Sequence, residues 1–164
     1  MFGQAPSVSL VHFTEHLGES ATHLGPLNDN MQDLLDRADL ARRFDLAAGS
    51  VIYLRKHFEL TTHTAAAGIG VDTTSKNGKR RTFANILKEV DERIRIIPDE
   101  FAQDGYRLFS ELSAIIHGDA NEIEALDKFE ALRRLVVGVS ENVRNRAEFA
   151  SARSDLGWSS GGEG

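Results

Sequence analysis

The sequence contains no cysteine, so the chain forms no disulfide and offers no thiolate ligand to a metal ion. It also lacks any apolar run approaching the ~20 residues that span a bilayer, and its first residues do not resemble a secretion signal. Positive charge is in deficit, with 19 Lys and Arg residues against 25 Asp and Glu. These absences predict a cytoplasmic protein with no membrane segment, which can contact nucleic acid only through a local basic patch.

The sequence also lacks strand patterns and internal repeats. Apolar residues instead recur at helical spacing, which predicts an all-α bundle of about five to six helices. The 164 residues are enough for a single globular domain. The expected helices cover residues 7–24, 27–41, 45–67, 81–94, 98–116 and 121–149.

The domain is expected to span residues 1–150. Residues 151–164 are small, polar and glycine-rich, so we expect a flexible tail apart from whatever holds Trp158.

The segment 45–67 is apolar on two faces, one carrying Val51, Leu54 and Phe58 and the other Tyr53 and Leu60. A helix of this kind is usually central or lies at a subunit interface. On it, Arg55 and Glu59 have i,i+4 spacing and predict a structural ion pair worth only ~0.3 to 0.5 kcal/mol.

The segment 68–81, GIGVDTTSKNGKRR, has three glycines and no helical period, which predicts an exposed loop. Its basic residues, with the neighbouring hydroxyls of 73–75, could contact phosphates. An ordinary solvated loop is the alternative, and the glycines do not form a Walker motif. The candidate phosphate-binding residues are Lys76, Lys79, Arg80 and Arg81.

The expected helix 7–24 carries His12, His16, Glu19 and His23 within one narrow arc, a spacing that could hold a divalent metal. The alternative is a solvated face opposite the apolar stripe of the same helix. We expect this simpler arrangement, and no motif calls for a cofactor.

The stretch SELSAIIHGD ends an apolar helical run at His117. Tyr106, Ser110 and Ser113 share a polar stripe with this histidine, which could act as an acid, a base or a phosphate donor. The alternative is a histidine at a helix C-terminus, where Gly118 supplies a left-handed cap.

Three segments together carry a family resemblance: DLAAGSVIYLRKHFE (45–59), TFANILKEVDERIRIIP (82–98) and ELSAIIHG (111–118). In this order they resemble the HEPN superfamily of helical higher-eukaryote and prokaryote nucleotide-binding domains, particularly a bacterial branch associated with restriction and defence proteins. The resemblance covers about 45–145 and leaves 1–44 as an N-terminal helical extension. It implies a homodimer in which the two His117 helices face each other across a groove.

In the ribonucleases of this family, an arginine four to six intervening residues before the histidine helps to cleave RNA without metal. Leu112, Glu111 and Ser110 occupy those places here, and Arg107 is farther away and about 80° off the His117 stripe. A carboxylate in place of the cation would repel a scissile phosphate. The resemblance therefore predicts a module with a degenerate catalytic motif that binds RNA or a nucleotide, with Arg107 as a further phosphate contact.

Two other functions remain open. The first is a metal-independent endoribonuclease or toxin that uses His117, with Tyr106, Ser110 or Arg107 as helpers. The second is a protein-interaction or transcription-regulatory subunit, because the chain also resembles the family of the mannitol operon repressor. Such a subunit would bind a protein encoded nearby.

Overall fold

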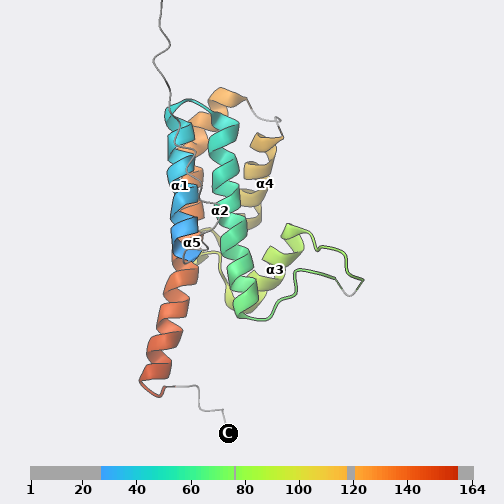
Figure 1. Cartoon of the computed structure of the whole chain (residues 1–164), viewed down its shortest axis with the longest axis vertical. Coiled ribbons are helices and arrows are strands. Elements are labelled where there is room, and N and C mark those ends of the chain that lie inside the picture. The colour runs from blue at the N-terminus through green and yellow to red at the C-terminus, as the bar shows by residue number, and fades with distance from the viewer. Residues whose placement is uncertain (1–26, 76, 118–120, 159–164) are drawn as a thin grey trace, which may run out of the picture.

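The structure, a computed structural model, describes residues 27–75, 77–117 and 121–158. These residues form five α-helices and one short 3-10 helix (Figure 1). The all-α fold expected from the sequence is confirmed, whereas the expected helix 7–24 lies outside the described residues. The elements are α1 (Leu27–Arg43), α2 (Ala47–Gly68), α3 (Phe83–Ile94), η1 (Asp99–Asp104), α4 (Gly105–Ile116) and α5 (Glu122–Asp155).

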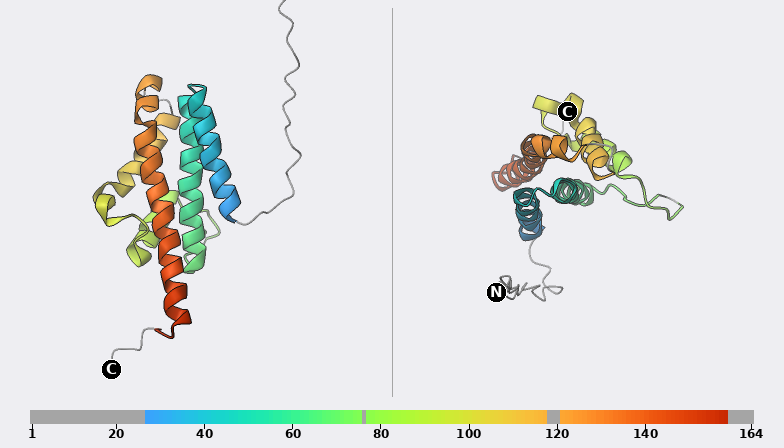
Figure 2. Two further views of the ribbon diagram at one scale, coloured as in Figure 1. Left: turned by 90° about the vertical axis from the view of Figure 1, so that its left-hand side faces the viewer. Right: turned by 90° about the horizontal axis from the view of Figure 1, so that it is seen from above.

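Helix α2 is the centre of the bundle, as its two apolar faces predicted. It packs against α1, α3, α4 and α5. Figure 1 and Figure 2 show α3 and the loop before it on the side of α2 away from α1. The largest fully buried side chains include Phe58 and Leu54 of α2 and Phe129 of α5.

A bidentate ion pair links helix α1 to helix α5. Arg133 Nε and Nη2 donate to the two carboxylate oxygens of Asp39 at 2.7 and 2.9 Å. Both side chains are about one-third exposed (29% and 33%). The bidentate geometry, rather than deep burial, is therefore what makes this ion pair stabilise the contact between the two helices.

The segment between α2 and α3 is a loop, as predicted, but it has a regular turn at its tip. Ser75 N–H donates to Lys79 O at 2.7 Å, and Arg81 N–H donates to Thr73 O at 3.0 Å. Gly78 permits this reversal because its φ is +72°, a left-handed conformation that favours glycine. The predicted site residue Lys76 lies outside the described residues.

Several helix boundaries differ from the sequence prediction, most of them by one or two residues. Helix α3 begins at Phe83 rather than 81, because the Thr82 side chain accepts from Asn85 N–H and caps the helix. The segment 98–116 is not one helix, since Phe101 has a non-helical φ of −139° and α4 begins only at Gly105.

Helix α5 continues to Asp155, beyond the predicted end at 149, so residues 151–155 of the expected flexible tail are helical. Alanine and arginine in this stretch favour helix. Gly157, with φ +69°, then ends it, and Trp158 N–H donates back to Arg153 O at 2.8 Å. None of the helices in the described ranges is long and apolar enough to cross a membrane.

The start of α4 depends on a close contact with the preceding turn. Ile97 is buried, and its N–H donates to Asp91 Oδ1 at 2.9 Å. A Cβ added at Gly105 would overlap the Ile97 side chain, approaching Cγ2 to 2.8 Å. Glycine at 105 therefore lets α4 begin directly against this buried side chain.

We expect Gly105→Ala to lower the free energy of unfolding by about 1 to 3 kcal/mol, because the new methyl group overpacks the contact with Ile97. Urea denaturation measures the change. Gly138→Ala in α5 is the matched control: its Cβ would meet only Phe101 at 3.9 Å, so we expect a gain of about 0.5 to 1 kcal/mol. Equal effects of the two substitutions would contradict this explanation.

Candidate functional site

Three polar side chains follow one face of α2 at intervals of four residues: Arg55, Glu59 and His63. Arg55 Nε lies 2.9 Å from Glu59 Oε1, the ion pair expected from the spacing. The two side chains are 25% and 31% exposed, and His63 is half-buried. This face of α2 is therefore polar but only partly open to solvent.

Aromatic rings from α3 and α4 pack beside this polar face. The Arg55 guanidinium lies 5.1 Å from the centre of the Phe109 ring, a cation–π contact. The Phe83 ring centre lies 4.7 Å from that of Phe109 and 6.0 Å from that of His63. Phe83 thus links α3 to both α2 and α4 and holds His63 in place.

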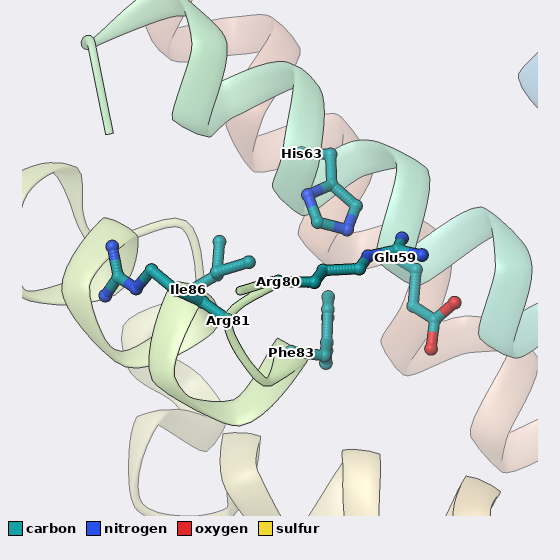
Figure 3. Close-up of a pocket in the computed structure, with 6 residues that line it drawn as sticks. All are labelled: Glu59, His63, Arg80, Arg81, Phe83 and Ile86. Carbon is teal, nitrogen blue, oxygen red and sulfur yellow. The ribbon is translucent and has the colours of Figure 1, made fainter. Parts of the chain in front are cut away.

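A cavity of about 250 Å³ opens at this point. We call it the polar cleft; its lining residues are Glu59, His63, Arg80, Arg81, Phe83 and Ile86 (Figure 3). In Figure 3 the Arg80 side chain reaches from the loop across the cleft toward Glu59, with His63 and Phe83 on either side. Arg81 points away from it.

The two adjacent arginines have different roles. Arg81 Nη1 donates to Asp72 O at 2.7 Å, and Arg81 Nη2 lies 2.6 Å from Glu89 Oε2. The hydrogen bond from Arg81 lowers the pKa of Glu89, whose other carboxylate oxygen accepts from Arg93. Arg81 therefore anchors the loop to α3, and its guanidinium already has partners within the chain, while the phosphate contact expected for it stays a prediction.

Arg80, by contrast, is exposed and forms no ion pair with the other described residues. Lys79 is also exposed, next to the turn. These two cations remain available to a ligand at the edge of the polar cleft.

The polar cleft combines the groups that suit a phosphorylated aromatic ligand. Arg80 can bind a phosphate through several N–H groups, and His63 can donate a further hydrogen bond. Phe83 offers an aromatic surface for a base, and Glu59 can accept from a ribose hydroxyl or an amino group. His63 and Phe83 were missed as site residues, although the spacing of His63 from Arg55 and Glu59 was a usable signal.

The predicted catalytic stripe on α4 is arranged differently. The Ser110 hydroxyl donates to Tyr106 O at 3.2 Å, and the Ser113 hydroxyl donates to Phe109 O at 2.8 Å. Both serines thus bond to their own helix. The Tyr106 hydroxyl is a poor acid, because desolvation first, and then the nearby acidic groups of α3, raise its pKa.

His117 is exposed at the C-terminal cap of α4, where its backbone N–H donates to Ser113 O at 3.1 Å. A histidine at a helix C-terminus was one of the two alternatives that the sequence left open for His117. The expected cap Gly118 lies outside the described residues. Arg107 lies 3.9 Å from the carboxylates of both Asp104 and Glu111. Its charge is therefore directed to acidic neighbours one turn away.

Within 27–75, 77–117 and 121–158, no group of three or more histidine and acidic side chains could hold a metal ion. The weak metal candidates His12, His16 and His23, with Glu19, lie outside these ranges.

No protein-family model, curated protein or solved structure matches the chain. The HEPN resemblance therefore stays a prediction, and the chemistry of the polar cleft is what indicates the ligand that it can bind.

We expect Arg81→Ala to speed amide hydrogen exchange at Ser75 and at position 81, because the anchor that holds the turn against α3 is lost. Mass spectrometry of exchanged peptides measures the rate. Arg80→Ala is the matched control and should leave it unchanged, since its side chain makes no ion pair with the described residues. If both variants exchanged alike, Arg81 would not be the anchor.

Proposed function

We propose that the chain is an RNA- or nucleotide-binding helical module whose polar cleft takes a phosphate together with an aromatic base. The observation that carries this proposal is the position of Arg80, an exposed cation that enters a cleft between His63 and the Phe83 ring. Phosphate binding by the guanidinium and stacking on the phenyl ring act on neighbouring parts of one nucleotide.

The overall charge limits how such a module binds. A net charge of −6 repels a nucleic acid at long range, so affinity must come from the few cations around the cleft. One or two neutralised phosphates imply a shallow salt dependence, with a slope of about −0.7 per phosphate for a single strand.

The wider context is also a proposal. On the basis of the sequence resemblance, we propose that the module belongs to the HEPN superfamily. It would act as a cytoplasmic homodimer in a bacterial or phage defence or regulatory system. Support for a dimer comes from exposed apolar side chains at the end of the bundle where α4 ends and α5 begins (Figure 1). This apolar end consists of Leu40, Phe44, Leu46 and Ile123, which are 53 to 70% exposed.

The ribonuclease alternative gains no comparable support. The serines of the α4 stripe bond to their own helix, and Arg107 faces acidic side chains. A subunit that binds another protein remains compatible with the exposed Phe149, Leu156 and Trp158 at the far end of α5.

We expect Arg80→Ala and His63→Ala each to weaken binding of a labelled single-stranded RNA about five-fold or more, as loss of a charged hydrogen bond does. Fluorescence anisotropy at 50 and 200 mM salt measures this, and Arg80→Ala should also reduce the salt slope by about 0.7. Arg146→Ala is the matched control, because Arg146 is an exposed arginine on α5, outside the cleft.

Equal losses in all three variants would assign binding to general charge, and no binding by the unaltered protein at 50 mM salt would refute the proposal. The same RNA, incubated with and without EDTA, tests the enzyme alternative. Cleavage that is lost in His117→Ala would favour a ribonuclease.

For the dimer, we expect Phe44→Glu to convert the protein from twice the chain mass to a single chain mass. Phe44 is 69% exposed in the single chain, so the substitution should leave each chain folded. Light scattering after size-exclusion chromatography measures the mass. Phe149→Glu, at the far end of α5, is the control; a monomeric unaltered protein, or dissociation by this control alone, would contradict the assignment.

A further inference from the structure

A second cavity lies on the other side of α2, between α1, α2 and α5. Its volume is about 590 Å³, within the range of small-molecule sites in proteins. We call it the α1–α2–α5 groove. Its apolar lining comes from α1 and α5 and includes Met31, Leu35, Val137, Val143 and Ala147, whereas α2 contributes the polar residues His57, Thr61 and Thr64.

The groove and the polar cleft use opposite faces of α2. At 100° per residue, His57, Thr61 and Thr64 point about 180° away from Arg55, Glu59 and His63. The neighbouring elements differ accordingly, because α3 and the loop border the cleft while α1 and α5 border the groove. A ligand of the groove is therefore independent of the function proposed for the cleft.

Four polar residues of α2 are fully buried, and they divide into two pairs. The Ser50 hydroxyl donates to Ala47 O at 2.8 Å, and the Thr62 hydroxyl donates to Phe58 O at 3.0 Å. Neither residue lines the groove. The remaining pair, His57 and Thr61, lines the groove and is only 2% and 1% exposed.

Each residue of this second pair has a polar atom without a partner. His57 Nε2 and Thr61 Oγ1 are buried and form no hydrogen bond with any described residue. Buried polar atoms are nearly always paired in folded proteins, so two unpaired ones, a single helical turn apart and beside the same groove, point to a ligand.

The protonation of His57 follows from its other ring nitrogen. His57 Nδ1 lies 3.0 Å from Met31 O, which can only accept, so Nδ1 carries the proton. Desolvation, the largest effect, and the charge of Arg133 lower the pKa of His57, while the bond to Met31 opposes them. The ring is therefore neutral near pH 7, and Nε2 is an acceptor.

We propose that the α1–α2–α5 groove binds a small neutral molecule with an apolar body and a head group that both donates and accepts a hydrogen bond, such as a hydroxyl or a primary amide. The head donates to His57 Nε2 and accepts from the Thr61 hydroxyl, while the apolar body lies against Met31, Leu35 and Val137. A carboxylate has no proton to donate to Nε2, and a bare hydrocarbon leaves both polar atoms unpaired.

The probes for this proposal are hexanamide and 1-hexanol, with hexanoate as a control of the same chain length. They are titrated into the full chain while the ring signals of the histidines are followed by NMR. We expect saturable shifts at His57 and none at His63, with hexanoate binding at least about five-fold more weakly. If neither neutral probe saturates up to its solubility, the groove holds only water or another part of the chain, and the proposal fails.

Thr61→Val separates ligand binding from a purely structural role. Removal of the unpaired hydroxyl should raise the melting temperature by about 2 to 4 °C and weaken hexanamide binding about five-fold. Thr62→Val is the matched control, with a neighbouring buried threonine whose hydroxyl is already paired, and it should leave the affinity unchanged. A Thr61→Val protein that is less stable, or that binds hexanamide as tightly as before, would overturn the proposal.

Discussion

The burial of α2 is the constraint on which the rest of the structure depends. Helices α1, α3, α4 and α5 all pack against it, so most of its side chains must be apolar or must find a hydrogen-bond partner. Two buried hydroxyls, Ser50 and Thr62, bond to backbone carbonyls of α2 itself, and other polar side chains of α2 line spaces that the neighbouring elements leave. Those spaces are the polar cleft on one side and the α1–α2–α5 groove on the other.

The polar cleft shows how this constraint can prepare a binding site. Glu59 and His63 are held by α2, Phe83 is fixed between α2 and α4, and Arg81 pins the loop that carries Arg80. A cation positioned in this way loses less conformational freedom when it binds a phosphate than one on an unanchored loop does. The division of roles between two adjacent arginines is thus the main link between the fold and the proposed function.

The sequence predicted the features that depend on local spacing. The central two-faced helix, the Arg55–Glu59 pair and the all-α architecture follow from periods of three and four residues. The contact of His63 with Phe83 depends on the path of the intervening loop, which no period encodes. The break before α4 was missed for a similar reason, since it reflects the close approach of Gly105 to Ile97.

The most direct test of the central claim, that the polar cleft rather than the α4 stripe contacts nucleic acid, is an NMR titration with a short single-stranded RNA. The ring signals of His57, His63 and His117 report on the groove, the cleft and the end of α4, respectively. We predict progressive shifts at His63 with no change at His57 or His117. Shifts at His117 with none at His63 would contradict the account.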